Sequence, residues 1–388
     1  MGKSVQKLTD SVNLIASKDT WIEGLATQQL IKTSELAGMH RVSGMPDLHP
    51  GRGYPIGAAF FTKNKIYPAL VGNDIGCGMA LWQSSLKVSK VNLDKIVKKL
   101  KDIELPLDDS WSDIIQMRRN EKNIRVQGFD HALGTIGGGN HFAEFQAVDE
   151  VYNERAFSAL GLSKQQLQLL VHSGSRGLGQ SILVKHITEH NHDGLQSSEQ
   201  SFTHYFEQHD EAVRWAELNR EMIAKRFLDA IRADGNVILD VNHNLVTAKE
   251  IGGMKGFLHR KGATPSDCGA VVIPGSRGDY SYLVKPRDDA DEAMYMSLYS
   301  LAHGAGRKWK RGECQGRLSH KYKRDDLYKT ELGSRVICAN KELLYDEAPQ
   351  AYKKAQTIIA DLEEAGLIDV IARLRPILTF KTNGGCST

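Results

Sequence analysis

Six short segments with reactive side chains, five of which also contain glycine, are spread between residues 46 and 307 of this 388-residue chain. They read PDLHPG from residue 46, NDIGCG from 73, GGGNHFAE from 137, VHSGSRG from 171, NHN from 242 and HGAGR from 303. Glycine permits tight turns and close backbone approach, so each segment suits a loop that aims a side chain at a site. Because no compact part of the chain contains all six, we expect one domain, residues 1–388, folded around a shared site.

Short apolar runs and helical segments follow one another without regular order. The expected strands are Ile56–Thr62, Met79–Trp82, Leu167–His172, Val237–Val241, Ala270–Ile273 and Tyr282–Val284. The expected helices are Trp21–Glu35, Asn92–Lys101, Glu211–Ala233 and Pro349–Ala365. Most of the strands run into polar loops, and no regular βαβ alternation is present, so the pattern favours an α+β fold.

The composition excludes several classes of protein. An apolar fraction of 41 % is enough for a globular core, whereas a net charge of +3 is too balanced to indicate nucleic-acid binding by itself. No run approaches the roughly 18 apolar residues of a membrane span. Five cysteines are present without a CxxC pair, namely Cys77, Cys268, Cys314, Cys338 and Cys386. We therefore expect a cytoplasmic protein without disulfides or a membrane partner.

A group of potential metal ligands occupies four of the six segments. Asp74 and Cys77 are three residues apart between glycines, and His141, His172 and His243 each lie at the end of a glycine-rich or β-type run. Such a set suits a divalent transition metal, and a bridging Cys77 thiolate would allow two ions. A thiolate with imidazoles favours zinc over manganese. Each residue taken alone is at least as often structural, so spacing by itself leaves both interpretations open.

Three other histidines, His186, His190 and His192, form a local cluster that we interpret as a solvated helix end or loop. The segment from His303 to Arg307 is more informative. A neutral imidazole can attack phosphorus, the glycines permit close approach to a phosphate, and Arg307 could clamp its oxygens. The alternative is a simple tight turn. No GxxxxGK[ST] phosphate loop is present, although residues 274–278, PGSRG, follow an expected strand in a similar way.

The chain resembles the RtcB family of RNA ligases in its combination of motifs, which are PDLHPG, DIGCGM, GGGNHFAE, VHSGSRGLG, HN, PGSRG and HGAGR. The short chain, the continuation HGAGRKWKR and the ending RPILTFK resemble most the subgroup found beside release factor H in bacteria. The resemblance implies a single α+β domain around a central metal cleft. It also implies joining of a 3′-phosphate or 2′,3′-cyclic phosphate RNA end to a 5′-hydroxyl end, with GTP and two Mn²⁺ ions as cofactors.

The resemblance assigns roles residue by residue. His303 matches the histidine that accepts GMP. The metal ligands would be Asp74, Cys77, His141, His172 and His243. The nucleotide contacts would be Asn140, His141, Phe142, Ala143, Glu144, His243, Asn244, Pro274, Gly275, Ser276, Arg277, Ser281, Gly304, Ala305, Gly306 and Lys381. Glu144 and Lys381 would read the guanine edge. Many relatives carry Met where this chain has Arg277, which adds charge beside the nucleotide.

RNA with broken ends is the expected partner, with a functional link to release factor H and the ribosome, and RNA repair as the expected process. Arg176 is a candidate phosphate contact, and Trp309 could stack a base. Two basic stretches could guide RNA, one of Arg307, Lys308, Lys310, Arg311, Lys321, Lys323 and Arg324, the other of Arg118, Arg119, Lys122 and Arg125. Two alternatives stay open. One is an enzyme that caps 3′ ends with GMP or processes cyclic phosphates without ligation, and the other is a non-catalytic, metal-stabilised RNA-binding module.

Overall fold

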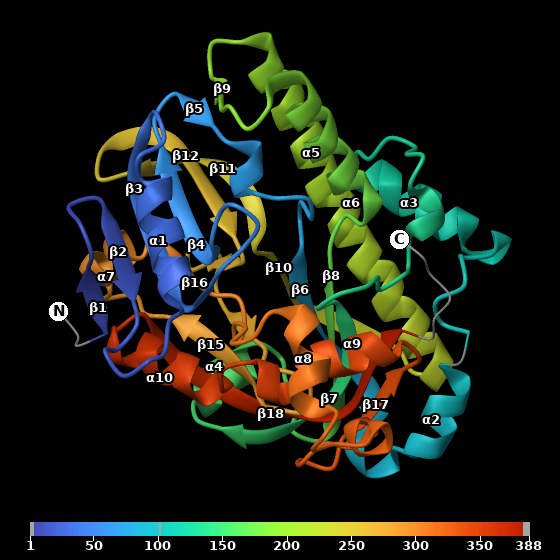
Figure 1. Ribbon diagram of the computed structural model, residues 1–388. Coiled ribbons are helices and arrows are strands. Elements are labelled where there is room, and N and C mark those ends of the chain that lie inside the picture. Colours follow the sequence, from blue (N-terminus) through green and yellow to red (C-terminus); the bar gives the residue numbers. More distant parts are fainter. Residues whose placement is uncertain (1–3, 101, 383–388) are drawn as a thin grey trace.

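The computed structural model describes residues 4–100 and 102–382 of the chain. Two large β-sheets and the helices packed around them make up this part of the molecule (Figure 1). The expected α+β class is confirmed. No helix in the described ranges is long and apolar enough to cross a membrane. The four described cysteines are free, as expected, while Cys386 lies outside the described residues.

The first sheet has six strands in the order β1-β2-β3-β4-β12-β11. Its strands are β1 Val5–Lys7, β2 Val12–Ile15, β3 Met39–His49, β4 Ile56–Thr62, β11 Asn244–Ile251 and β12 Met254–Lys261. All neighbours are antiparallel except β2 and β3. The end of β3 and the start of β11 carry the PDLH and NHN segments, so this sheet brings two distant motifs to the site.

The second sheet has eight strands, seven of them in the order β10-β6-β8-β7-β18-β15-β14, while β17 pairs with β18 in parallel. The strands are β6 Gly78–Lys87, β7 Phe142–Val151, β8 Gln166–Ser173, β10 Gly235–Asn242, β14 Val271–Ile273, β15 Ser281–Pro286, β17 Arg335–Cys338 and β18 Ile368–Thr382. Two short pairs complete the strands, β5 Lys65–Ile66 with β9 Leu195–Gln196, and β13 Ala263–Pro265 with β16 Ser300–Ala302.

The α-helices of the described part are α1 Gly24–Thr33, α2 Leu93–Lys99, α3 Ser112–Lys122, α4 Glu154–Ala159, α5 Gly177–His190, α6 Gln200–Ile231, α7 Asp291–Met296, α8 Arg311–Leu318, α9 Lys341–Asp346 and α10 Ala355–Glu364. The longest, α6, packs against β6 and β8 and is the long yellow-green helix of Figure 1. Phe227 of α6 meets Phe145 of β7 and Phe380 of β18 at ring distances of 5.9 and 5.6 Å, which fixes the helix on the sheet.

The two sheets share one apolar core. Ile15 and Met45 from the first sheet belong to the same buried cluster as Val271 and Val284 from the second. Buried apolar contact of this kind is what makes separate sheets one folding unit. The single-domain organisation stays a prediction, which this shared core supports.

All six expected strands lie within observed strands, apart from Ala270, which precedes β14. Two expected helices need correction. Helix α6 begins at Gln200 instead of Glu211, because Phe202, Tyr205 and Phe206 continue its apolar face toward the N-terminus. The segment Pro349–Ala365 is not one helix, since α10 begins only at Ala355.

The break before α10 has a physical cause. Pro349–Ala351 forms a single 3₁₀ turn, and Tyr352 then adopts an extended backbone. The amide of Lys353 donates to the carbonyl of Gly306, and its ammonium group donates to two carbonyls near the end of β3. These tertiary bonds hold the chain out of a helical path.

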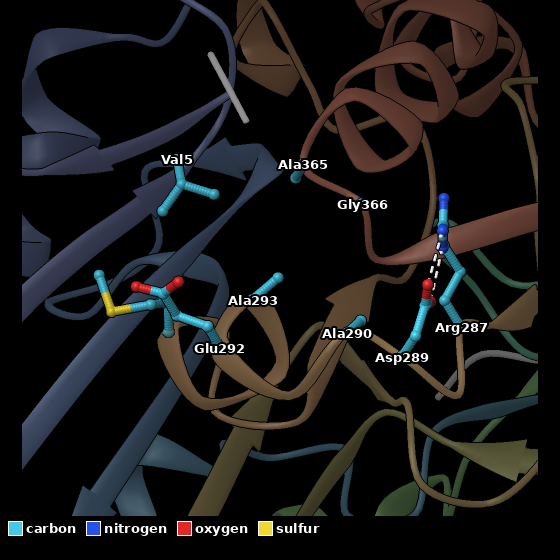
Figure 2. A pocket seen from close by; sticks show the side chains of 9 residues that line it. Val5, Arg287, Asp289, Ala290, Glu292, Ala293, Ala365 and Gly366 are labelled. Carbon is cyan, nitrogen blue, oxygen red and sulfur yellow. Dashed lines mark hydrogen bonds and ion pairs between the residues drawn. The ribbon is translucent and has the colours of Figure 1, made fainter. Parts of the chain in front are cut away.

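One surface cavity of about 270 Å³ lies between α7 and the end of α10 (Figure 2). Its lining residues include Val5, Arg287, Glu292, Met296 and Gly366, and Arg287 is paired with Asp289 beside it. None of the residues that sequence reasoning assigned to the site lines this cavity. The chemistry must therefore be sought among the motif loops.

Candidate functional site

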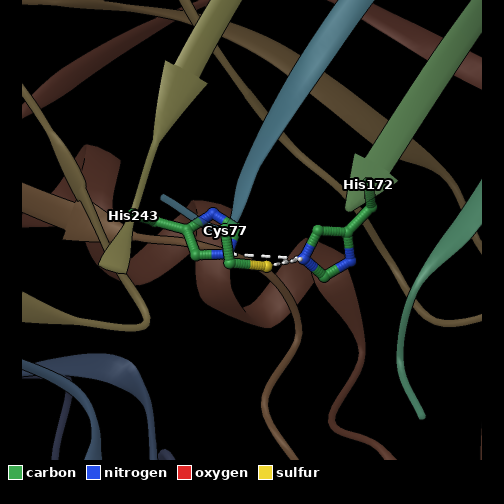
Figure 3. A group of neighbouring side chains, drawn as sticks. All are labelled: Cys77, His172 and His243. Atoms are coloured by element: carbon green, nitrogen blue, oxygen red, sulfur yellow. Dashed lines mark hydrogen bonds between the residues drawn. The ribbon is translucent and has the colours of Figure 1, made fainter. Parts of the chain in front are cut away.

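The five predicted metal ligands converge in the interior although they come from four distant segments. Cys77 Sγ lies 3.1 Å from His172 Nε2 and 3.4 Å from His141 Nε2. His141 Nε2 lies 2.7 Å from Asp74 Oδ2, and His172 Nε2 lies 3.3 Å from His243 Nε2. Figure 3 shows His172 and His243 on either side of Cys77. Four of the five are buried, and the side chain of Asp74 is 23 % exposed.

The ligand atoms fall into two overlapping groups. Cys77, His172 and His243 form one, and Asp74, Cys77 and His141 form the other, with all ligand atoms in a group within 4.8 Å of one another. Cys77 belongs to both groups, which is the geometry expected if its thiolate is shared between two ions. Metal binding itself stays a prediction, but sulfur, imidazole and carboxylate donors at this spacing suit divalent transition metals.

Backbone carbonyl groups fix the orientation of two of the imidazoles. His141 Nδ1 donates to the carbonyl of Ile136 at 3.1 Å, and His172 Nδ1 donates to the carbonyl of Asn140 at 3.2 Å. With the proton on Nδ1, the Nε2 lone pair of each ring faces the cluster. Second contacts of this type are typical of metal-binding histidines.

Burial sets the protonation of the cluster. Burial, together with the neighbouring histidines, lowers the pKa of both His172 and His243 well below the ordinary value, so both rings are neutral and able to bind a metal. Burial would raise the pKa of Asp74, but His141 outweighs it and the carboxyl pKa is lowered. Burial and the Asp74 charge raise the pKa of the Cys77 thiol, so a metal that binds there must displace its proton.

One buried guanidinium group ties the ligand segments together. Arg220 of α6 is fully buried, and its Nη1 donates to the carbonyls of Gly76 at 2.7 Å and Ser173 at 2.9 Å. Its Nη2 donates to Asn242 Oδ1 at 2.6 Å and its Nε to Asp240 Oδ1 at 2.7 Å. Each of the first three partners is directly next to a predicted ligand in the sequence. Sequence reasoning missed Arg220, which lies inside an otherwise ordinary helix.

His303 lies beside the metal cluster and is held by a buried carboxylate. Its ring is 5.0 Å from that of His243, and its Nδ1 is 2.6 Å from Asp47 Oδ2. The His303 amide also donates to Asp47 Oδ2 at 3.2 Å. A carboxylate at Nδ1 leaves the Nε2 lone pair free for attack and stabilises positive charge on the ring.

Asp47 belongs to the PDLHPG segment, but the sequence did not predict its contact with His303. It is fully buried at the end of β3. The Lys353 ammonium donates to the carbonyls of Pro46 at 2.8 Å and Leu48 at 3.1 Å, on either side of it. A side chain at Gly306, whose φ is +69°, would strike the Asp47 backbone, so glycine is required there.

The predicted guanine-reading residues, Glu144 and Lys381, lie on the adjacent strands β7 and β18. Gln146 Nε2 donates to Glu144 Oε1 at 2.7 Å and to Ser281 Oγ at 2.9 Å, and the Thr379 hydroxyl donates to Glu144 Oε2. Burial raises the pKa of Glu144 to about 7 even though these hydrogen bonds and Lys381 oppose the shift. Lys381 is buried with its ammonium 5.9 Å from the Phe142 ring centroid.

Other residues that were predicted to contact the nucleotide make contacts within the protein. The Asn244 amide donates to the Asp74 carbonyl at 3.2 Å and accepts from the Gly262 amide at 2.7 Å, which braces two loops. Ala143 is buried in β7. The loop of Pro274, Gly275, Ser276 and Arg277 approaches the Gly304–Gly306 turn, since a Cβ on Gly304 would lie 3.4 Å from the Pro274 carbonyl. Their contacts with a nucleotide stay predictions.

The prediction for Arg307 is wrong. Its guanidinium donates to Glu347 Oε1 at 3.1 Å, the Tyr352 hydroxyl at 2.8 Å, the Asp346 carbonyl at 2.8 Å and the Trp309 carbonyl at 3.2 Å. Its fifth N–H donates to Cys314 Sγ at 3.4 Å. A group enclosed in this way has no donor left to clamp a phosphate, and it serves to anchor the turn after His303.

Two surface predictions also need correction. The stretch from Arg118 to Arg125 is neutralised by acidic partners, chiefly Glu211, Glu217 and Glu221 on α6, so it offers little net charge to RNA. His186 is not solvated, because it is buried in α5 and its Nε2 donates to the Asp193 carbonyl at 3.1 Å. In contrast, Lys308, Lys310, Arg311, Lys321 and Lys323 are exposed, and the first three follow His303 within eight residues.

Comparison with known proteins decides the family. The family model described as tRNA-splicing ligase RtcB matches residues 29–128 and 114–382. A protein of Escherichia coli named RNA-splicing ligase RtcB2 is 54 % identical over 389 residues, which cover 99 % of both chains.

The chain belongs to the RtcB family. More distant members include RNA-splicing ligase RtcB of Escherichia coli K12, 27 % identical over 94 % of this chain and 96 % of its own length. The tRNA-splicing ligase RtcB of Thermococcus kodakarensis is 28 % identical over 90 % of this chain and 89 % of its own. The resemblance seen in the motifs is therefore confirmed at the level of the family.

The role of Arg220 in this RtcB-family site gives a first prediction. In Arg220→Met, Asp240 and the carbonyls of Gly76 and Ser173 lose their buried partner. Asp240 is partly exposed and can regain water, but each buried carbonyl left without its donor costs about 1–3 kcal/mol. We therefore expect urea unfolding at a clearly lower midpoint and weaker Mn²⁺ binding. Arg214→Met on the same helix is the control. Equal unfolding midpoints for both variants would show that Arg220 does not hold the ligand loops.

Proposed function

We propose that the chain is a GTP- and Mn²⁺-dependent RNA ligase that joins 3′-phosphate or 2′,3′-cyclic-phosphate ends to 5′-hydroxyl ends through GMP carried on His303. The observation that carries the proposal is the position of His303. Its Nδ1 is held by Asp47 at 2.6 Å, and its ring lies beside a cluster of five potential metal ligands. The names of the relatives, RNA-splicing and tRNA-splicing ligase, support the same reaction class.

The first chemical step follows from the His303–Asp47 pair. His303 Nε2 attacks the α-phosphorus of GTP, a P–N bond forms, and the bond to pyrophosphate breaks. Asp47 holds the ring in position and offsets the positive charge that develops on it. Bound Mn²⁺, held by Asp74, Cys77 and the three histidines, would supply positive charge to the phosphate oxygens. The carboxylate of Asp74 makes the donor set acceptable to manganese, although the thiolate and imidazoles alone suit zinc better.

The remaining steps transfer the activated group to RNA. A 3′-phosphate oxygen attacks the phosphorus of GMP and frees His303, which leaves an RNA end activated by GMP. The 5′-hydroxyl oxygen of the second RNA then attacks the 3′-phosphorus, the new phosphodiester forms, and GMP leaves. His303 is thereby restored for another cycle.

The exposed cations after His303 offer a path for the RNA backbone. Lys308 and Arg317 flank Trp309 at 5.8 and 5.2 Å from its ring, so base stacking there would compete with these two cations. Arg176 lies against Gly137, and its charge acts on Asp74, which is consistent with a phosphate contact at the cluster. RNA repair linked to release factor H and the ribosome is the biological setting that we propose.

A joining assay tests the proposal. With GTP and Mn²⁺, the parent should ligate an RNA ending in a 3′-phosphate to one beginning with a 5′-hydroxyl. His303→Ala should lose this activity by several orders of magnitude, because it removes the proposed nucleophile, whose Nδ1 lies 2.6 Å from the Asp47 carboxylate. His190→Ala, a more exposed histidine on α5, is the matched control.

The same assay separates the alternatives. Accumulation of RNA capped with GMP, without joined product, would favour the end-modifying enzyme. RNA that stays unchanged with folded, metal-loaded protein would favour the non-catalytic binding module. Either result would reject the ligase proposal.

The protonation of Glu144 predicts a pH dependence of nucleotide binding. Its pKa is raised to about 7, so the carboxyl is mostly neutral at pH 6 and ionised at pH 8. An ionised carboxylate is the better acceptor for the N1–H and 2-amino groups of guanine, so GTP affinity should rise about tenfold between pH 6 and pH 8.

Equilibrium dialysis of GTP with His303→Ala, in which covalent transfer is blocked, measures this effect. Glu144→Gln in the same background should bind GTP more weakly at pH 8 and lose the additional rise. Because ionisation of the GTP phosphates is common to both proteins, an identical pH dependence would reject a role for Glu144 in binding guanine.

A further inference from the structure

Arg277 carries a buried charge that lacks a full set of partners. The residue is 7 % exposed, and within the described residues its Nε and Nη1 have no hydrogen-bond partner. Burial lowers the pKa of its guanidinium, but arginine still keeps its charge at neutral pH. Burying a charge without hydrogen bonds is expensive, so such a group indicates a ligand that completes its contacts.

The one nearby carboxylate cannot satisfy Arg277, because other groups already surround it. Glu347 lies 3.1 Å from Arg307, 3.5 Å from Arg311 and 3.7 Å from Lys381, and it accepts a hydrogen bond from the Tyr352 hydroxyl. Cations therefore outnumber this carboxylate, and two of them, Arg277 and Lys381, repel each other. Buried cations that lack acceptors favour a ligand rich in hydrogen-bond acceptors.

The position of the loop that carries Arg277 indicates where that ligand would lie. Its first residue, Pro274, lies against Gly304, next to the nucleophile His303. Arg277 is three residues further on, and its electrostatic neighbours are Cys338, Glu347 and the tyrosines beside them. Cys338 is paired with Thr382 at the end of β18, directly after Lys381. The loop thus runs from beside His303, where the α-phosphate of GTP is proposed to bind, toward the predicted guanine-reading residues Glu144 and Lys381.

We propose that Arg277 is a specificity-determining residue that donates hydrogen bonds to N7 and O6 of the guanine base. The inference rests on the proposed function and names a recognition element that this function does not require. Guanine presents two acceptors on that edge, whereas adenine presents an acceptor at N7 and a donor at N6. The fork of an arginine side chain matches the two acceptors of guanine, and adenine would turn an amino group toward two cations.

Binding of GMP, 7-deaza-GMP and AMP tests this proposal, because monophosphates bind without transferring GMP to the protein. 7-Deaza-GMP differs from GMP only in lacking the N7 acceptor. Calorimetric titration of the Mn²⁺-loaded parent should show about tenfold weaker binding of 7-deaza-GMP than of GMP, and still weaker binding of AMP.

Arg277→Met should weaken GMP binding and bring the GMP to 7-deaza-GMP ratio close to one. Arg277→Lys keeps a charge but not the fork, so it should recover part of the affinity for GMP without the full N7 preference. Arg287→Met, a partly exposed arginine paired with Asp289 outside the proposed site, is the matched control and should keep the parental ratio. A role in folding alone would not change a ratio between two ligands.

Three outcomes would overturn the proposal. Equal binding of GMP and 7-deaza-GMP by the parent would show that N7 is not read, a result that needs no variant. An unchanged ratio in a folded Arg277→Met protein would place the recognition elsewhere, and an equal loss for both nucleotides would assign Arg277 to the phosphate. If the parent bound no guanine nucleotide at all, the proposed GTP-dependent function would fail as well. GMP binding by the parent therefore distinguishes failure of the Arg277 proposal from failure of the proposed function.

Discussion

The hydrogen bonds of Arg220 are the constraint on which the site depends most. A single guanidinium, fully buried in α6, binds backbone and side-chain oxygens next to Cys77, His172 and His243. These three segments are far apart in the sequence, and each lies at the end of a strand: Cys77 directly precedes β6, His172 is near the end of β8, and His243 directly follows β10. The buried guanidinium needs these oxygens as acceptors, and the oxygens need it as a donor. The hydrogen bonds of both are therefore complete only when the ligand loops pack against α6. The contact of α6 with the eight-stranded sheet thus determines the geometry of the metal cluster.

A second buried charge network positions His303, the proposed nucleophile. Lys353 holds the carbonyls on either side of Asp47, and Asp47 in turn meets both the ring and the amide of His303. This chain of contacts joins the end of β3, the turn after β16 and the segment before α10. It also explains why that segment is extended where its sequence resembles a helix. The first sheet supplies Asp47, and the second supplies His172 together with the predicted guanine-reading residues Glu144 and Lys381. His303 directly follows β16.

Much of this arrangement could be predicted from the sequence, because local patterns carry the information. Alternating or continuous apolar runs located the strands, and the motif loops located all five potential metal ligands. The parts that were missed depend on tertiary contacts. Nothing in the sequence marks Arg220 as different from other arginines of α6, and the enclosure of Arg307 by Glu347 and Tyr352 is invisible without the fold. The acidic partners that neutralise the Arg118–Arg125 stretch lie about ninety residues away in the chain, which is why charge counting misjudged it.

The central claim is that His303 forms a covalent bond with GMP, and peptide mapping tests it most directly. The parent protein is incubated with GTP and Mn²⁺ in the absence of RNA, digested under conditions that preserve a P–N bond, and analysed by mass spectrometry. The account predicts one GMP on the peptide that contains His303, none after incubation with ATP, and a marked loss in Asp47→Ala. A GMP adduct on a different residue, or no adduct in folded, metal-loaded protein that still joins RNA, would contradict it.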